Sequence, residues 1–484
     1  MAIILLLVIP IIAIILSALF GHKKEILEKI NCVSSVLELL AGGYIVEQVV
    51  VSHSYSLFPY FSVEALSALI LGLTVLVGII ATFHGVEYFE LELGKKMISE
   101  KTMQHSYILM RVFLVSMYAA IVTANPIIMW ISIEVTSLTS VFLINFFNRP
   151  EDLEAAWKFL IINSVGLLFG LLGTLLFLSQ GEGLGRIFIQ WTDLMSVAHS
   201  MSPTLLKFAY LFVIIGYGTK MGFVPMHTWK PDTYNKAPLP VVALLSGALL
   251  NVAFLAILRF TLIANISIGK AFSQNLFLFF GFISVTLAGS IIYTQKNYKR
   301  MLAYSTIEHA GLMLLGIGFG GIGIFGALLH MIYHSLGKAF FFLLSSNVAV
   351  RYSSSIIAEV KGLLKTLPVT GVLYIFAFLF ITGMPPFGIF FSEFYIFLGG
   401  FAHHIIITSI VILMLIFVFV GFFRSIISMV FTPAPEGVEQ GETSMWGLVP
   451  VGALALILVI ISFYLPPFVT QLLKESVQTI TNIR

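Results

Sequence analysis

Long apolar runs separated by short polar segments recur along the whole chain. Most runs reach about 20 residues, the length that a helix needs to cross the hydrocarbon core of a membrane. The pattern predicts an all-α polytopic membrane protein with about fourteen transmembrane helices. The expected spans are 2–20, 28–51, 63–86, 106–124, 126–147, 156–179, 204–226, 238–263, 275–294, 300–318, 321–349, 366–399, 404–431 and 446–467. The first run lacks a preceding basic region, so we expect a retained helix rather than a cleaved signal peptide.

Three spans contain residues that interrupt helices. Gly222 and Pro225 lie in the last turns of the seventh span, SLG at 335–337 lies in the eleventh, and GMPP at 383–386 lies in the twelfth. Two inverted five-helix repeats, spans 4–8 and 9–13, would place the broken helices 7 and 12 at equivalent positions, a pattern typical of transport sites. The predicted segments are an N-terminal three-helix segment, two half-channels, and a last helix with a short tail, at 1–105, 106–263, 275–431 and 446–484.

Basic residues are distributed unevenly between the two sides of the predicted membrane. With fourteen spans, one side holds eighteen of them: Lys23, Lys24, Lys29, Lys95, Lys96, Lys101, Arg111, Arg149, Lys158, Lys230, Lys236, Lys296, Lys299, Arg300, Arg351, Lys361, Lys365 and Arg424. The other side holds six: Arg186, Lys207, Arg259, Lys270, Lys474 and Arg484. Because cytoplasmic loops carry the excess of Lys and Arg, both termini are predicted on the non-cytoplasmic side of the cell membrane.

Composition supports a place in the lipid bilayer and excludes several functions. The 484 residues are 59% hydrophobic and 10% charged, whereas soluble domains average about 25% charged residues. The net charge of +3 comes from scattered residues, so no nucleic-acid partner is expected. The single cysteine, Cys32, excludes disulfides and any thiolate-held iron–sulfur or nickel centre within this chain. No cofactor is therefore expected on this chain.

A lysine inside an apolar span is the first candidate for chemistry. Lys220 lies in YGTKMGFVPMHTWKPD with no acidic residue within ten positions, and an unpaired ammonium in a membrane costs several kcal/mol. Glu134, more than two turns inside the fifth span in WISIEVTSLTS, is its predicted partner. Burial disfavours the charged form of each group and an approaching opposite charge restores it, so a movable pair would bind and release a proton. A static ion pair and an interfacial glutamate stay open as alternatives.

A second group of titratable residues lies in the eleventh span. His330, His334 and Lys338 are spaced i, i+4 and i+8, so they line one face of a helix along which protons can pass. A zinc site is disfavoured because HMIYH lacks the internal glutamate of zinc proteases and no third ligand is evident. Haem ligation is disfavoured because only this helix offers a close histidine pair. A packing role for both histidines stays open.

Single polar residues in other spans complete a series. Glu393 follows the GMPP interruption, where irregular backbone can line a water-filled cavity. Asn251 lies in the eighth span, and Glu308 and His309 lie side by side in the tenth. Polar groups in so many separate spans of an apolar chain predict a path for ions across the membrane.

Five motifs carry a family resemblance: WISIE, GTKMGFVPMHTWKPDTYNKAP, KRMLAYSTIEHAG, HMIYHSLGKAFFF and GMPPFGIFFSEF. With these motifs the chain resembles the antiporter-like membrane subunits shared by respiratory complex I, Mrp antiporters and group 4 NiFe hydrogenases. Within that family, its motifs are most similar to those of the hydrogenase-4 component F branch. Many relatives carry a lysine in the eighth span where this chain has Asn251. Because an amide is no proton carrier, water or neighbouring groups would have to bridge that step.

The resemblance implies a fourteen-helix inverted-repeat fold and a role for each matched residue. Glu134 would tune the proton affinity of Lys220 in the first half-channel. Lys338 and the histidines of the same span would carry protons along the central axis, and Glu393 would be the terminal carrier of the second half-channel.

The predicted function is translocation of protons, or of sodium ions, by a subunit of a redox-driven membrane complex of the hydrogenase or formate hydrogenlyase type. The resemblance implies other membrane subunits and a peripheral cytoplasmic redox arm as partners, with NiFe and iron–sulfur centres on those partner subunits. The alternatives are an Mrp-like or stand-alone cation/proton antiporter and a proton-pumping subunit of complex I. A helical scaffold is a further class, in which the buried charges would be replaceable.

Overall fold

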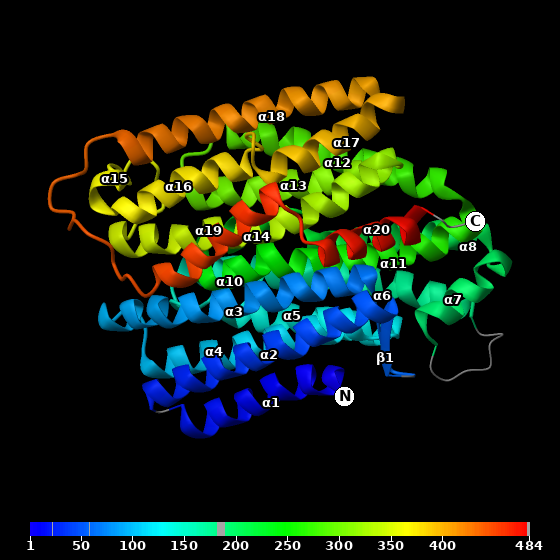
Figure 1. The fold of residues 1–484 in the computed structure, drawn as a ribbon, viewed down its shortest axis with the longest axis horizontal. Helices are drawn as coiled ribbons and strands as arrows, with labels where there is room; N and C mark the ends of the chain where they lie inside the picture. The colour runs from blue at the N-terminus through cyan, green and yellow to red at the C-terminus, as the bar shows by residue number, and fades with distance from the viewer. Residues whose placement is uncertain (22, 58, 182–188, 482–484) are drawn as a thin grey trace.

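The computed structural model describes residues 1–21, 23–57, 59–181 and 189–481. This part of the chain is almost entirely helical (Figure 1). The helices are α1 (Ala2–Phe20), α2 (Lys24–Ser52), α3 (Ala65–Gly94), α4 (Glu100–Val122), α5 (Pro126–Ile144), α6 (Pro150–Ser179), α7 (Trp191–Val197), α8 (Pro203–Met221), α9 (Trp229–Lys236), α10 (Leu239–Leu244), α11 (Leu250–Ile268), α12 (Lys270–Ile292), α13 (Tyr298–Phe319), α14 (Ile322–Tyr352), α15 (Leu363–Thr366), α16 (Pro368–Ile381), α17 (Gly388–His403), α18 (Ile405–Ile426), α19 (Leu448–Phe463) and α20 (Pro467–Thr481). The shorter elements are the antiparallel strands β1 (Ser54–Leu57) and β2 (Phe61–Glu64), the 3-10 turn η2 (Ala198–Ser200), and the π-helical turns η3 (Leu245–Leu249) and η4 (Ile427–Phe431).

Every apolar run predicted to cross the membrane coincides with a helix or with a broken helix. Eleven of the described helices are long and apolar enough to span a bilayer, or twelve if the bent pair α19 and α20 counts as one span. The remaining predicted spans coincide with α8 and with α16 and α17 together. Helices satisfy their own backbone groups, as lipid requires. The all-α membrane class is confirmed, while the count of fourteen and the inverted-repeat relation stay predictions.

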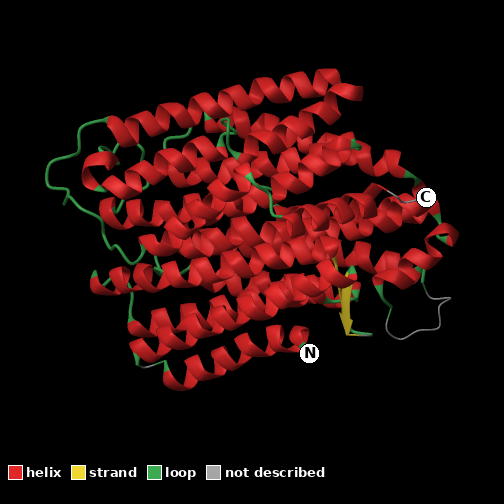
Figure 2. Cartoon of the chain, in the orientation of Figure 1, coloured by secondary structure: helices red, strands yellow, loops and turns green. Residues whose placement is uncertain are grey.

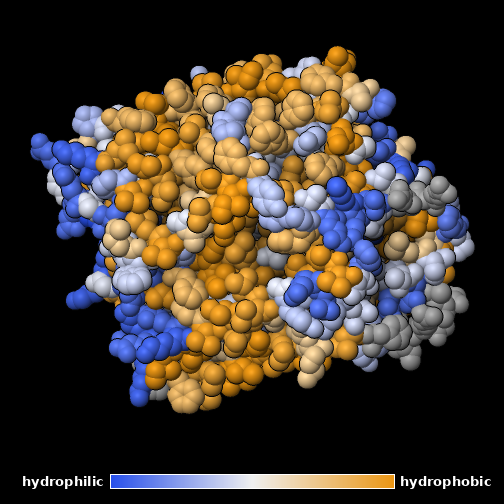
Figure 3. All heavy atoms as spheres, in the orientation of Figure 1, coloured by the Kyte–Doolittle hydropathy of each residue, from blue (hydrophilic) through white to orange (hydrophobic). Residues whose placement is uncertain are grey.

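The long helices lie side by side in one bundle and share a common direction (Figure 1). Figure 2 shows that the visible strand lies at one end of this bundle. Apolar residues cover the middle of the face drawn in Figure 3, and hydrophilic residues gather toward its two ends. This distribution matches a bundle whose middle lies in hydrocarbon and whose ends meet water.

The helix interruptions predicted at the seventh and twelfth spans are present. Helix α8 ends at Met221, where Gly222 adopts a φ of 74°, and α9 begins at Trp229. Helix α16 ends at Ile381, Gly383 adopts a φ of 66°, and α17 begins at Gly388. Glycine is favoured at both turns because other residues are strained at positive φ.

The interruption predicted at 335–337 is wrong. Helix α14 continues through this segment without a break. Gly337 has a packing role instead, since a Cβ atom there would lie 2.8 Å from Cε1 of Phe380 on α16. The glycine allows two helices to approach closely, which is the common use of small residues between membrane helices.

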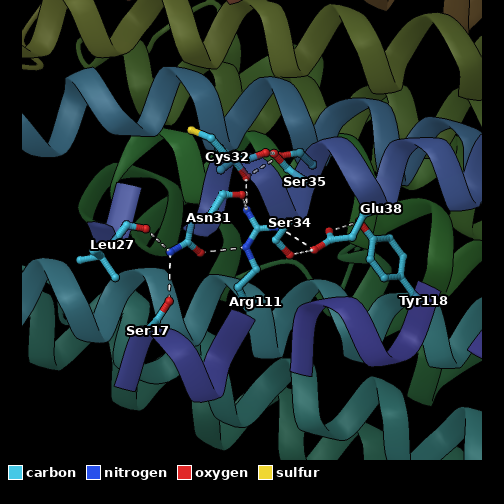
Figure 4. A network of polar contacts seen from close by, with 11 residues as sticks. Ser17, Leu27, Asn31, Cys32, Ser34, Ser35, Glu38, Arg111 and Tyr118 are labelled. Carbon is cyan, nitrogen blue, oxygen red and sulfur yellow. Dashed lines mark hydrogen bonds and ion pairs between the residues drawn. The ribbon is translucent and has the colours of Figure 1, made fainter. Parts of the chain in front are cut away.

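A buried polar network joins the N-terminal helices α2 and α4 (Figure 4). Arg111 on α4 forms an ion pair with Glu38 on α2 at 2.8 Å between Nη1 and Oε1, and both side chains are almost fully buried. Its other nitrogens donate to the Asn31 side chain at 3.0 Å and the Asn31 carbonyl at 3.1 Å. Glu38 also accepts hydrogen bonds from Ser34 at 2.6 Å and Tyr118 at 3.0 Å. Both charges are therefore satisfied inside the membrane bundle.

Two of the eighteen basic residues assigned to one side of the membrane are buried inside the bundle. Arg111 lies within α4 and Lys230 within α9, and each is 1% exposed. Both residues lie near the end of an apolar run, so the sequence made them resemble charged residues of loops, although the fold buries them. Arg186 and Arg484, assigned to the opposite side, lie outside the described residues. The sidedness of the chain stays a prediction.

The C-terminal segment, predicted as a short tail, contains the amphipathic helix α20. This helix bends 66° away from α19. A cavity of about 670 Å³ lies among α2, α3, α14, α19 and α20, and its walls include Leu73, Ile332, Leu336 and Ile461. Apart from Glu47, all of its lining residues are apolar or glycine.

Candidate ion-translocation site

The break between α8 and α9 exposes backbone carbonyls that side chains of α9 satisfy. The Trp229 Nε1–H donates to the carbonyl of Thr219 at 3.0 Å, and the Lys230 ammonium donates to the carbonyl of Met221 at 2.6 Å. The last carbonyls of a helix have no partners within the helix. These side chains therefore stabilise a helix end inside the bundle and hold Lys220 in its final turn.

Lys220 and Glu134 belong to one polar cluster, with hydroxyl groups around the carboxylate. The Lys220 Nζ donates to Ser137 Oγ at 2.8 Å, and Ser137 Oγ lies 3.4 Å from Glu134 Oε2. Ser164 on α6 donates to Glu134 Oε1 at 3.2 Å. The ammonium also lies 5.0 Å from the centre of the Phe159 ring, where a cation and a ring attract each other. A serine therefore links the two charged residues that sequence reasoning paired.

A second lysine lies in α14. Lys338 is fully buried, and its Nζ donates to Ser305 Oγ at 2.7 Å and to the Leu302 carbonyl at 3.4 Å, both on α13. Glu308, one turn further along α13, is within electrostatic reach of Lys338. The second half of the chain thus repeats the combination of a buried lysine, a serine hydroxyl and a nearby carboxyl group.

Two predicted histidines form a hydrogen-bonded chain across three helices. The Nδ1 of His309 on α13 lies 2.7 Å from the Nε2 of His330 on α14. The Nδ1 of His330 lies 2.9 Å from Ser392 Oγ on α17. His334 lies beside them, with its ring centre 5.1 Å from that of His309. Imidazoles that share a hydrogen bond can accept a proton on one nitrogen and donate from the other.

Glu393 lies in the second turn of α17, close to the second helix break. Its side chain packs against Gly383, where a Cβ atom would lie 3.0 Å from the carboxyl carbon. The residue is 9% exposed. Within the described chain its carboxyl group has no hydrogen bond or ion pair. The position beside irregular backbone agrees with the sequence prediction.

The helix that contains Asn251 has a π-helical turn, η3, which the apolar pattern did not reveal. Such a turn displaces the backbone hydrogen bonds and is frequent at functional sites. The Gly247 carbonyl accepts from Asn251 Nδ2 at 3.0 Å and from the Ser335 hydroxyl of α14. The Asn251 Oδ1 is buried and has no partner among the described residues. A buried acceptor of this kind suits a bound water molecule. Such a water is what proton transfer past Asn251 would require, because the amide itself carries no proton.

Sequence reasoning missed Lys230 as a site residue. Its ammonium lies 5.7 Å from the Trp229 ring centre and 5.9 Å from the Tyr234 ring centre. It is also within electrostatic reach of Lys338, so this third buried lysine lies near the helix that carries Lys220 and near α14. The sequence signal for this role was the position of Lys230 shortly after the GFVP break. The adjacent Pro231 and Asp232, however, made the segment resemble a loop.

The argument against a metal site also needs correction. The sequence offered no third ligand beside the histidines of the eleventh span. In the structure, His309, His330 and Glu393 can each present one donor atom, with all three atoms within 4.8 Å of one another. The third donor comes from α17, which the fold packs against α14.

Residues 123–421 match the model of a known family, described as NADH:quinone oxidoreductase/Mrp antiporter, TM. The match covers more than half of the chain, which therefore belongs to this family of antiporter-like membrane subunits. The family resemblance carried by the five sequence motifs is confirmed.

Particular relatives narrow this assignment. The chain is similar to the hydrogenase-4 component F homolog of Methylacidiphilum infernorum, with 32% identity over 420 residues, which cover 85% of this chain and 87% of the relative. It is similar in structure to a chain of the membrane-bound sulfane sulfur reductase, an archaeal respiratory membrane complex, with a TM-score of 0.88, 21% identity and coverage of 99% and 98%. A chain of the Mrp complex from a Dietzia species gives a TM-score of 0.84 at 17% identity, with coverage of 99% and 97%. These two structures share the fold of this chain.

Proposed function

We propose that this chain translocates protons as the antiporter-like subunit of a redox-driven membrane complex of the hydrogenase type. The observation that carries the proposal is the set of buried titratable groups on separate helices, each beside a helix break, a π-helical turn or a hydrogen-bonded hydroxyl. Lys220, Lys230, Lys338 and His330 are at most 1% exposed. Burying so many ionisable groups in a membrane protein is costly and marks ion pathways.

Proton transfer would use the lysines as sites whose charge changes. When Lys220 holds its proton, the Ser137 hydroxyl and the nearby Glu134 stabilise the ammonium. When the carboxylate moves away, desolvation dominates and the lysine releases its proton. Lys230 then offers a position toward α14, where Lys338 and its serine partner repeat the arrangement.

The donor chemistry favours protons over sodium ions. Sodium is a hard cation that is best held by several oxygen atoms, like other hard cations. The central cluster instead presents imidazole nitrogens and ammonium groups, and the contact of 2.7 Å between His309 and His330 is a hydrogen bond suited to proton exchange. Exit through Glu393 would place the terminal proton carrier beside the second helix break.

Partners and orientation follow from the relatives and from loop charge. A relative named as a hydrogenase-4 component supports a complex in which NiFe and iron–sulfur centres lie on other subunits. Coupling would reach this chain as a displacement of charge in a neighbouring membrane subunit. The loop bias supports a cytoplasmic position for the lysine-rich end and a non-cytoplasmic position for both termini.

The test compares Lys220→Ala with Lys207→Ala, an exposed lysine on the same helix α8. Everted membrane vesicles that contain the whole complex are supplied with hydrogen, formate or reduced ferredoxin, and internal acidification is followed with a pH-sensitive dye. Proton uptake should be lost with Lys220→Ala and kept with Lys207→Ala at equal protein levels. Uptake that persists in Lys220→Ala would favour a scaffold, and uptake driven by a sodium gradient alone would favour an Mrp-like antiporter.

A further inference from the structure

Three buried donor groups from separate helices converge at the centre of the second half of the chain. His309 on α13, His330 on α14 and Glu393 on α17 each direct one donor atom to a common region, with the three atoms within 4.8 Å of one another. Both histidines are fully buried and Glu393 is 9% exposed. Two imidazoles and one carboxylate form a donor set that binds divalent transition-type ions.

The carboxyl group of Glu393 is the observation that points to a ligand. Among the described residues it has no hydrogen-bond or ion-pair partner, although Glu393 as a residue is only 9% exposed. The close packing of Gly383 against this group holds it near the histidines. A buried carboxylate without a partner is costly, and a bound cation removes that cost.

We propose that His309, His330 and Glu393 form a binding site for a borderline divalent cation such as Zn²⁺. The cation binds between the two facing nitrogens, and the proton of their hydrogen bond moves to Nε2 of His309, beside Glu308, so that both imidazoles stay neutral. Each facing nitrogen then lies about 2.0–2.1 Å from the metal. Ser392 contacts the second nitrogen of His330 at 2.9 Å and fixes the orientation of that ring, as outer partners of metal ligands do. A water molecule completes four-coordination.

The carboxyl groups near the site can offset the positive charge that a bound cation adds to that of Lys338. The ammonium of Lys338 is within electrostatic reach of both histidines and opposes a second positive charge. The carboxyl groups of Glu393 and Glu308 offset it, and Glu308 Oε2 lies 3.7 Å from His309 Nε2. Nitrogen donors disfavour Mg²⁺ and Ca²⁺, which prefer oxygen ligands. The inference does not rest on the proposed function, because metal binding needs only these donors.

The experiment measures Zn²⁺ binding by equilibrium dialysis of the purified full-length chain in detergent. The variants are His330→Gln, Glu393→Gln and, as a matched control, His403→Ala at the exposed end of α17. We expect the wild-type chain and the control to bind Zn²⁺ alike, and each site variant to bind about tenfold or more weakly. Equal binding by all four proteins, or none by the wild type, would overturn the proposal.

A second measurement needs only the wild-type chain, so it decides the question even if a variant fails to fold. X-ray absorption at the zinc edge of the loaded protein should show two imidazole ligands with nitrogens about 2.0–2.1 Å from the metal, together with oxygen ligands. A spectrum without imidazole ligands would refute the assignment of the site to these histidines.

Discussion

Replacement of Arg111 by methionine tests whether the buried network of Figure 4 stabilises the bundle. In the variant, Glu38 keeps the hydroxyl donors Ser34 and Tyr118 and loses its only cationic partner among the described residues. Breaking a buried ion pair by removing one partner costs about 3–5 kcal/mol. Thr82 and Asn31 also lose charge-assisted hydrogen bonds to Arg111. We therefore expect Arg111→Met to lower the free energy of unfolding by about 3–5 kcal/mol.

A double variant separates the cost of an unpaired charge from the loss of packing. Arg111→Met combined with Glu38→Gln removes both charges, so it should be less destabilised than Arg111→Met alone. Unfolding is followed by circular dichroism during titration of detergent micelles with sodium dodecyl sulfate. Lys158→Met is the control, since this exposed lysine pairs with Glu154 and Asp232 at the surface and should change stability by at most about 1 kcal/mol. The reasoning fails if Arg111→Met matches the control, or if the double variant is the least stable protein.

Three further predictions concern the pathway and its packing. Ser137→Ala removes a charge-assisted hydrogen bond to Lys220 worth about 1.5–3 kcal/mol, so proton uptake by the vesicles should slow by about tenfold or more. The control is Ser140→Ala, which should leave uptake unchanged because the Ser140 hydroxyl bonds only within its own helix. Lys230→Met should reduce proton uptake at unchanged protein level, and normal uptake would exclude this lysine from the path. Gly337→Val should lower the free energy of unfolding by about 1–3 kcal/mol through overpacking against Phe380, measured by thermal denaturation; an unchanged midpoint would contradict this packing role.

The sequence revealed the spans and most candidate site residues because each signal is local. An apolar run of membrane length is visible in any short window, and so is a lysine such as Lys220 inside one. The breaks at Gly222 and Gly383 were also predictable, since a glycine followed by proline two or three residues later favours a turn over a continuous helix.

The features that sequence reasoning missed depend on contacts between distant segments. Gly337 resembles a helix breaker until Phe380 is seen to pack against it. Arg111 resembles a loop residue until Glu38, 73 residues earlier, is placed beside it. Glu393 becomes a neighbour of His330 only because α17 packs on α14. Periodicity within one helix carries no information about these partners.

On the side of α14 away from its histidines, the cavity offers almost no polar group to which a proton could pass. Residues two positions apart on a helix point about 200° away from each other, so Ile332 and Leu336 turn toward the cavity while His330 and His334 turn toward the relay. Apart from Glu47, the lining residues offer water no hydrogen-bond partner in their side chains, and proton transfer needs a chain of hydrogen-bonded groups or water molecules. In the proposed function, this apolar wall would keep protons on the histidine face of α14.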